Sequence, residues 1–114
     1  MISVYGLKNC DTCRKALAWL VEQEIPHRFH DVRKDGFGDV ESWIAACGHE
    51  ALINRRGTTW RKLPEHEKRN LDEARTAALI RAWPAVMKRP LFVSGSRVLV
   101  GFSAATRSAL AAPC

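Results

Sequence analysis

Residues 5–20, with the sequence YGLKNCDTCRKALAWL, decide the fold and the chemistry expected of this chain. A short apolar strand pattern, residues 1–5, leads into this stretch. After Cys10 the apolar spacing becomes helical, with positions i, i+3, i+4 and i+7 filled by Cys13, Ala16, Leu17 and Leu20. We therefore predict a strand, a short loop and a helix from Asp11 to about Glu24.

Cys10 lies where the loop becomes the first turn of this helix. Free backbone N–H groups and the positive end of the helix dipole stabilise a thiolate there. Lys8, Arg14 and Lys15 add cationic charge nearby in the sequence. We predict that Cys10 is a nucleophile.

Cys10 and Cys13 form a Cys-x-x-Cys motif, a spacing at which a second thiol can close on the first. Cys13 lies on the apolar stripe of the helix, so it is expected to face the core. It is either a resolving thiol or a small hydrophobic residue. Cys47 also lies on an apolar stripe and is expected in the core, whereas Cys114 is expected to be exposed and incidental.

Length and composition indicate a single domain. The chain has 114 residues, 46% of them hydrophobic and 26% charged, which is ordinary for a globular protein. Four unevenly spaced cysteines do not make a disulfide scaffold, and no signal peptide or membrane-spanning run is recognisable. We therefore expect a protein of the reducing cytoplasm, with no membrane association.

The charge is distributed unevenly along the chain. The net charge is +6, and all 12 acidic residues lie at or before Glu73. The cationic C-terminal third favours an anionic partner, although a solvated basic face without a partner explains the charge equally well. Direct nucleic-acid binding is less favoured, because no series of aromatic residues interleaves the basic ones.

The order of the predicted elements gives the fold class. A second strand at 27–32, with Phe29 on its buried side, completes a parallel β-α-β unit. Near the C-terminus, strands at 91–93 and 98–100 form an antiparallel hairpin, and Ser103 caps a last helix to about Ala112. This is an α/β protein with a mixed sheet, β-α-β then β-β-α, which is the thioredoxin-like arrangement.

Between the two halves lies a predicted helical insertion. We expect a helix capped by Asp39 and ended by Gly48, a short helix at 50–54 and a loop at 55–61. Pro64 is expected at the first helical position of a short helix, and a capping box at 70–73 is expected to open a helix that ends near Trp83. The domain thus comprises a thioredoxin-like core, 1–37 and 84–114, and an insertion, 38–83.

Two further features are a spacing close to that of a zinc finger and an X-Pro bond. Cys10, Cys13, His27 and His30 approach zinc-finger spacing, but residues 27 and 30 of one strand point to opposite faces, so no metal is expected.

Pro90 enters a strand where a thioredoxin-like fold places a cis-proline. If this fold is correct, Arg89 lies beside Cys10, where it can bind an anion and lower the thiol pKa.

Several motifs together resemble the ArsC/Spx family, close to its YffB-type branch. They span nearly the whole chain and comprise Tyr5-Gly6-x-Lys8-Asn9-Cys10-Asp11-Thr12, Phe29-His30-Asp31, Leu52-x-Asn54-Arg55-x-Gly57-Thr58-Thr59-Trp60-Arg61-Lys62-Leu63, Lys88-Arg89-Pro90 and Val100-Gly101-Phe102. The resemblance implies a thioredoxin-like fold with a helical insertion. It also implies thiol chemistry that draws on glutathione or glutaredoxin.

The resemblance implies a glutathione-linked reductase, an oxidoreductase with no bound cofactor and with glutathione as co-substrate. Cys10 is the expected nucleophile, Cys13 the possible resolving thiol, and Arg89 an anion-binding residue. The substrate is a small anion, a thiol or a disulfide, and the protein is expected to be a monomer. The residues expected to bind substrate or glutathione are Lys8, Asn9, Thr12, Arg55, Arg56, Arg89 and Pro90.

Three positions depart from glutaredoxin-linked arsenate reductases, which hold the oxyanion with three arginines. Arg89 matches one of them, but Asn54 and Gly101 stand at the other two, and Gly6 replaces a histidine. Since each charge-assisted contact contributes about 1.5–3 kcal/mol, this predicts a weak arsenate site. The alternative is a Spx-type regulator, in which a Cys10–Cys13 switch governs binding to RNA polymerase, at the C-terminal domain of its α subunit.

Overall fold

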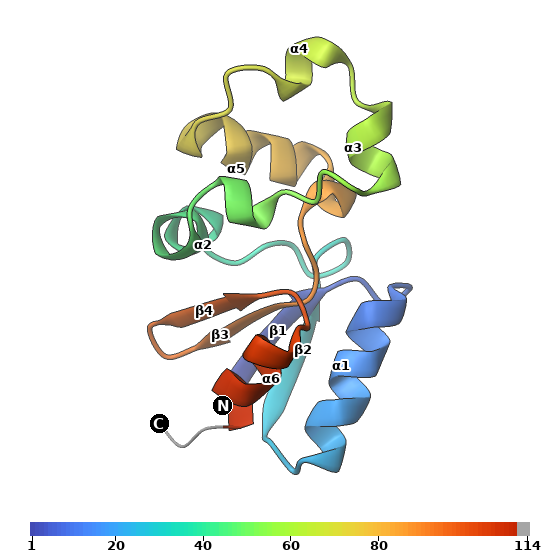
Figure 1. Cartoon of the computed structure of the whole chain (residues 1–114), viewed down its shortest axis with the longest axis vertical. Coiled ribbons are helices and arrows are strands. Elements are labelled where there is room, and N and C mark those ends of the chain that lie inside the picture. Colours follow the sequence, from blue (N-terminus) through green and yellow to red (C-terminus); the bar gives the residue numbers. More distant parts are fainter. Residues whose placement is uncertain (112–114) are drawn as a thin grey trace. The chain divides into compact units, whose positions relative to one another are not determined.

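The computed structural model describes Met1–Ala111 and contains a four-stranded mixed sheet with the strand order β2-β1-β3-β4 (Figure 1). β1 pairs in parallel with β2, and β3 pairs antiparallel with both β1 and β4. The strands are β1 (Ile2–Gly6), β2 (His27–Asp31), β3 (Leu91–Ser94) and β4 (Arg97–Val100). The predicted β-α-β and β-β-α halves are therefore confirmed.

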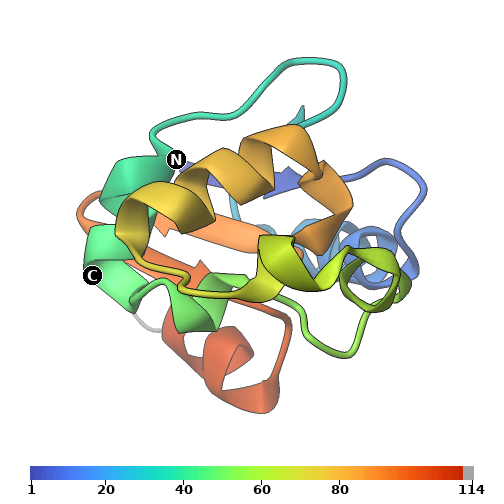
Figure 2. The same cartoon turned by 90° about the horizontal axis from the view of Figure 1, so that it is seen from above.

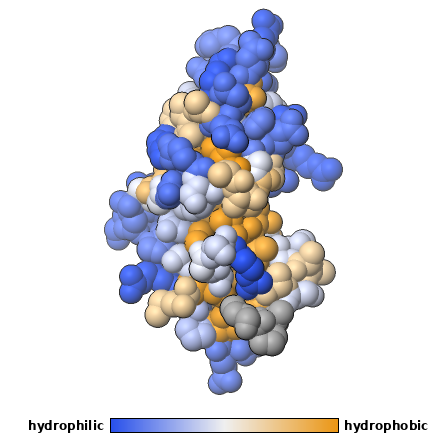
Figure 3. Space-filling view, turned by 90° about the vertical axis from the view of Figure 1, so that its left-hand side faces the viewer, coloured by the Kyte–Doolittle hydropathy of each residue, from blue (hydrophilic) through white to orange (hydrophobic). Residues whose placement is uncertain are grey.

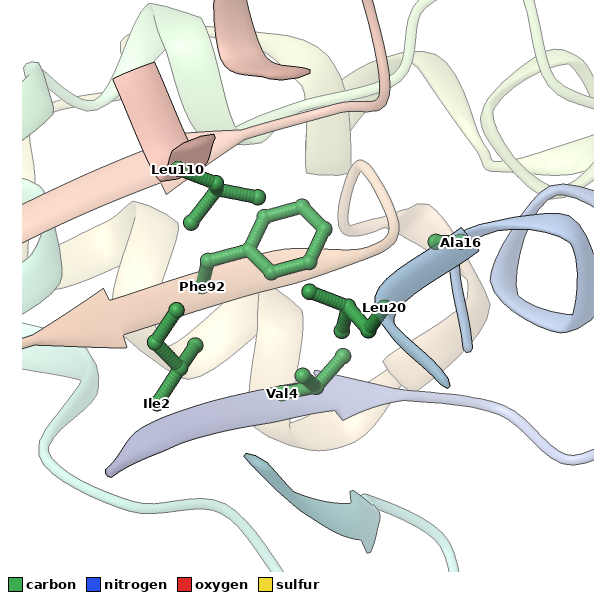
Figure 4. Packing of buried hydrophobic residues seen from close by; sticks show 6 residues of the cluster. All are labelled: Ile2, Val4, Ala16, Leu20, Phe92 and Leu110. Atoms are coloured by element: carbon green, nitrogen blue, oxygen red, sulfur yellow. The ribbon is translucent and has the colours of Figure 1, made fainter. Parts of the chain in front are cut away.

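Two helices cover one face of this sheet: α1 (Asp11–Glu22) and α6 (Ala104–Ala111). Figure 4 shows their apolar side chains meeting those of β1 and β3 in one cluster, which consists of Ile2, Val4, Ala16, Leu20, Phe92 and Leu110. The alternation of β1 explains which side is covered, because Val4 is fully buried whereas Ser3 and Tyr5 are only partly buried. The side chain of Ser103 accepts the Thr106 N–H and caps α6, as expected.

The backbone divides into two compact units, one formed by Met1–Gly36 with the chain from Arg89 on, and the other by Phe37–Lys88. The second unit is helical. It contains α2 (Val40–Cys47), η1 (Glu50–Leu52), α3 (Thr58–Lys62), α4 (Glu65–Lys68), α5 (Glu73–Ala82) and η2 (Pro84–Val86). Figure 2 shows α2 and α5 side by side, in agreement with the contacts between them.

Three local predictions for the second unit are wrong. The segment predicted as a loop at 55–61 contains most of α3, whose helix begins directly after Gly57. Pro64 is the N-cap of α4 and not its first helical residue. The helix α5 is capped by Asp72, which accepts the Arg75 N–H at 2.8 Å, so the expected capping box starting at Asn70 does not form. Only at α5 does a side-chain cap explain the difference, because the Asp72 carboxylate accepts a helix N–H, whereas Gly57 and Pro64 cap α3 and α4 without a side-chain hydrogen bond.

Burial in the second unit depends on position along each helix. Cys47 is half-buried and not in the core as predicted, because it is the last residue of α2 and the chain turns away at Gly48. α3 and α4 hold no buried residue. On the face drawn in Figure 3, hydrophilic residues gather at the top, where α4 lies in Figure 1.

Cys114 lies outside the described residues. Among residues 1–111, no helix is long and apolar enough to cross a membrane.

Candidate functional site

Cys10 is the N-cap residue of α1, directly after the loop that leaves β1. Its backbone is extended, with φ −98° and ψ 122°, so the chain turns into the helix at this residue. The first residue of the helix is Asp11. The position predicted for Cys10 at the loop–helix junction is therefore confirmed.

The Cys10 thiol has a pKa below its ordinary value. Partial burial alone would raise this pKa. It is outweighed by hydrogen bonds to the sulfur from the Cys13 backbone N–H, the Arg89 guanidinium and the Cys13 thiol, and by the positive charge of Arg89. The site therefore favours a thiolate, the nucleophilic form.

The cations that lower this pKa are not those next to Cys10 in the sequence. Lys8, Arg14 and Lys15 were expected to contribute, but all three side chains are exposed, and Lys15 forms an ion pair with Asp11 at 3.2 Å. Water screens such charges. The effective charge comes from Arg89, which lies 79 positions further along the chain (89 − 10 = 79).

Cys13 behaves in the opposite way. It is 1% exposed, and burial, followed by the influence of the neighbouring Cys10, raises its pKa to about 12. Its thiol nevertheless contacts the Cys10 thiol. The prediction that Cys13 faces the core is confirmed, and the pKa values of the two thiols of the motif are shifted in opposite directions.

Gly6 makes room for the buried thiol. A Cβ atom at residue 6 would lie 2.5 Å from the Sγ atom of Cys13, whereas its other nearest atoms, Phe29 Cε1 and Cys13 Cβ, would lie at 3.5 and 3.6 Å. Any side chain at this position must displace Cys13. This explains why glycine accompanies the Cys-x-x-Cys motif in this chain.

Gly6→Ala is expected to lower the free energy of unfolding by about 1–3 kcal/mol, because overpacking forces side chains out of their preferred positions. In a Cys13→Ala background the same substitution should cost clearly less, since the remaining contacts are ordinary. Urea denaturation of the four proteins in this double-mutant cycle measures the difference. An equal cost in both backgrounds would show that Cys13 is not what the new Cβ meets.

Arg89 and Pro90 connect the end of the second unit to β3. The peptide bond between them is cis, as expected for a thioredoxin-like fold. Pro90 is buried, and its carbonyl accepts the Gly101 N–H at 2.8 Å, which fixes this connection against the end of β4. The connection positions the Arg89 side chain at Cys10.

The other predicted binding residues fall into two groups. Lys8, Asn9 and Thr12 are exposed around the Cys10 loop. Arg55 and Arg56 belong to the second unit, where they line a pocket of about 580 Å³ together with Glu50, Ile53, Asn54 and Lys88.

The basic pocket is assembled by backbone pairing that the sequence does not reveal. An antiparallel bridge joins Ile53 to Met87, and the Lys88 N–H donates to the Leu52 carbonyl at 2.8 Å. This pairing brings Lys88 to the two arginines. Lys88 was not among the predicted binding residues, because only this tertiary contact relates it to the pocket.

An aromatic contact holds the Arg55 side chain of this pocket, and a turn contact holds the backbone at Arg56. The guanidinium carbon of Arg55 lies 5.5 Å from the centre of the Trp60 ring, and the Asn54 side chain accepts the Arg56 N–H at 3.2 Å. The pocket therefore gathers three cationic residues, Arg55, Arg56 and Lys88, beside one acid, Glu50.

The two histidines considered for a metal have other contacts. The His27 ring pairs with the Ile25 carbonyl at 2.9 Å, and the His30 ring stacks on Tyr5 with 4.7 Å between ring centres. His27 pairs with Ile2 and His30 with Tyr5 in the parallel ladder, so they lie on opposite faces of the sheet. Among residues 1–111, no group of three or more metal-ligating side chains is found.

The mixed sheet, the Cys-x-x-Cys at the start of α1 and the cis-proline before β3 define a thioredoxin-like protein. Within this class the chain belongs to the ArsC family, whose family profile matches residues 5–110.

Three comparisons illustrate the family. An uncharacterized protein of Haemophilus influenzae is 42% identical over an alignment of 106 residues that covers 90% of this chain and 92% of that protein. The solved structure of a YFFB protein is 40% identical, covers 98% of this chain and 100% of its own, and has a TM-score of 0.91. The global transcriptional regulator Spx of Enterococcus faecalis is 30% identical over an alignment of 111 residues that covers 90% of this chain and 80% of Spx.

Proposed function

We propose that this protein is a glutathione-dependent thiol reductase with Cys10 as the nucleophile. The observation that carries the proposal is the lowered pKa of Cys10, which the Cys13 N–H and Arg89 bring about at the start of α1. Thiol–disulfide exchange proceeds through the thiolate, and the share of thiolate at a given pH rises as the pKa of the thiol falls. The reducing cytoplasm, which supplies glutathione, is the compartment that suits this chemistry.

The reaction proposed has two exchanges. The Cys10 thiolate attacks one sulfur of a substrate disulfide, so a Cys10–substrate disulfide forms, the substrate S–S bond breaks, and the other sulfur leaves as a thiolate that takes up a proton. A glutathione thiolate then attacks the mixed disulfide. It forms a disulfide with the substrate sulfur and returns Cys10 as a thiolate.

Glutathione is preferred over Cys13 for the second exchange. The raised pKa of Cys13 has burial as its largest cause, and this cause remains after Cys10 has reacted. The smaller contribution from Cys10 is lost when Cys10 enters a disulfide, so Cys13 becomes somewhat more acidic at that stage. Cys13 is therefore the slower, intramolecular route, and the Cys10–Cys13 disulfide that it yields needs two glutathiones for its reduction.

Anionic groups of the substrate or of glutathione are proposed to bind Arg89 and the arginines of the basic pocket, Arg55 and Arg56. Guanidinium groups bind carboxylates through paired, charge-assisted hydrogen bonds. The exposed residues of the Cys10 loop, namely Lys8, Asn9 and Thr12, and the peptide edge at Pro90 complete the proposed binding residues.

Arsenate is a poor candidate substrate. At the positions of two oxyanion arginines, the Asn54 side chain caps a turn by accepting the Arg56 N–H, and Gly101 has φ +83°, where a residue with a side chain is strained. Only Arg89 of the three remains, which agrees with the weak site predicted from the sequence.

The proposal is tested by measuring the alkylation rate of Cys10 with iodoacetamide against pH, with and without millimolar S-methylglutathione. This probe has no free thiol, so any protection reports binding and not exchange. A Cys13→Ala, Cys47→Ser, Cys114→Ser background confines the signal to Cys10. Saturable protection together with a pKa below the ordinary value of about 8.5 is expected, and a normal pKa without protection would overturn the proposal.

A second function is favoured by the contact between the Cys10 and Cys13 thiols and by the similarity to Spx. In this case oxidation to a Cys10–Cys13 disulfide would govern binding to the C-terminal domain of the α subunit of RNA polymerase. A pull-down with that domain under oxidising and reducing conditions tests it. Failure to bind in both states would remove this function.

A further inference from the structure

A second pocket, which belongs to the first unit, lies beside Cys13. It has a volume of about 590 Å³, within the range of small-molecule sites. Its walls come from the loop after β1, from α1, from β2 and from the turn that follows β2, and Cys10 is not part of them. The lining residues are Leu7, Lys8, Asn9, Cys13, Arg14, Leu17, Phe29, Asp31, Lys34 and Asp35.

The inner part of this pocket is apolar. Leu7 and Cys13 are buried, and Leu17 and Phe29 are only partly buried although they pack against the core. Phe29 was predicted on the buried side of its strand, and it keeps exposed surface because this pocket reaches its ring. The neutral thiol of Cys13 adds a further weakly polar surface. An apolar group can therefore displace water here.

The charged residues at the rim have unequal roles. The Asp31 carboxylate accepts the N–H groups of Lys8 and Arg33 at 3.3 and 3.0 Å, and the Asp35 carboxylate accepts the Asp31 N–H at 3.3 Å. Through these hydrogen bonds the two carboxylates stabilise the loops that form the rim of the pocket. Within residues 1–111, the side chains of Lys8, Arg14 and Lys34 form no ion pair.

We propose that this pocket, which we call the Cys13 pocket, binds a small amphipathic anion with an apolar or aromatic body and a carboxylate. The body contacts Leu17, Phe29 and the Cys13 sulfur, and the carboxylate pairs with cations of the rim. The proposal rests on the shape and charge of the pocket. Lys8 and Asn9 are shared with the residues proposed to bind substrate or glutathione, but the proposal does not depend on the reductase function. A bound ligand covers Cys13 without occupying Cys10.

Three probes test separately whether binding needs the apolar body and whether it needs the negative charge. The uniformly ¹⁵N-labelled protein is titrated with 4-phenylbutyrate, 4-phenylbutylamine or inorganic phosphate, and amide chemical shifts are followed by NMR. We expect 4-phenylbutyrate to bind at least about fivefold more tightly than either other probe. Only this probe has both an apolar body for the inner part of the pocket and a negative charge for the cations of the rim. Its shifts should centre on residues 7–9, 13–17 and 29–35.

Charge-reversal variants test the rim. Lys34→Glu and, separately, Arg14→Glu should weaken 4-phenylbutyrate binding about fivefold, whereas Lys62→Glu, an equal charge change at an exposed residue of α3, should leave it unchanged. The same spectra report whether each variant is folded. Equal binding of the amine or of phosphate, shifts centred elsewhere, or equal loss in Lys62→Glu would overturn the proposal.

Discussion

Cys10→Ser is expected to reduce glutathione-dependent disulfide reduction to the uncatalysed rate. A serine hydroxyl is not ionised near neutral pH and cannot form the mixed disulfide, so neither exchange can take place. The measurement is the reduction of bis(2-hydroxyethyl) disulfide by glutathione, coupled to glutathione reductase and NADPH. Cys13→Ala should retain most of this activity, because glutathione is proposed to resolve the mixed disulfide.

Cys47→Ser is the matched control for this experiment. It replaces another thiol of the same chain, half-buried at the end of α2 and with a pKa that burial raises, so it should keep full turnover. Full activity of Cys10→Ser would show that Cys10 is not the nucleophile. Full loss in Cys13→Ala would show instead that resolution is intramolecular.

Arg89→Met is expected to raise the pKa of Cys10 and to lower its alkylation rate at pH 6.5 by about tenfold. The substitution removes both a hydrogen bond to the sulfur and the nearby positive charge, and a hydrogen bond to a charged group contributes about 1.5–3 kcal/mol. The pH profile of iodoacetamide alkylation should therefore shift to higher pH. Because the thiolate is the reactive form, the rates of the two proteins should converge at alkaline pH, where both are ionised.

Arg14→Met is the matched control for the charge of Arg89. Arg14 is close to Cys10 in sequence, but its side chain is exposed and it is not among the groups that lower the pKa of Cys10. Its profile should resemble that of the unmodified protein. Arg89→Lys keeps the charge without the planar guanidinium, so its pH profile should lie between those of the unmodified protein and Arg89→Met. An equal shift in Arg14→Met and Arg89→Met would mean that a diffuse cationic field, and not Arg89, stabilises the thiolate.

The parts of the fold that follow from local sequence pattern were predictable. Alternating residues gave the strands, and the i, i+3, i+4 spacing after Cys10 gave α1 within two residues of its observed end. Errors occurred where several residues compete to end or begin a helix. Asp72 and not Asn70 caps α5, and Gly57 precedes a helix in a segment predicted as a loop. Such choices differ by about 1 kcal/mol, which is less than the packing of a few side chains.

The composition of the site was predicted more fully than its electrostatics. The structure brings Cys10, Cys13 and Arg89 together, as expected, but the other cations expected to act on Cys10 were its sequence neighbours. These side chains point into water and are screened, whereas Arg89 is carried to the thiol by the cis-proline connection into β3. The role of Lys88 in the basic pocket likewise depends on the Ile53–Met87 bridge.

The sequence by itself determined the order of strands and helices and the position of Cys10 at a helix start, because these depend on local periodicity and on backbone geometry within one turn. Only the tertiary structure decided which cation meets the thiolate, why residue 6 is glycine, and where the Cys13 pocket opens. These properties depend on contacts between residues that are distant in sequence, and on how far those residues are shielded from water. Charge, burial and close contact act over a few ångströms in space, irrespective of separation along the chain.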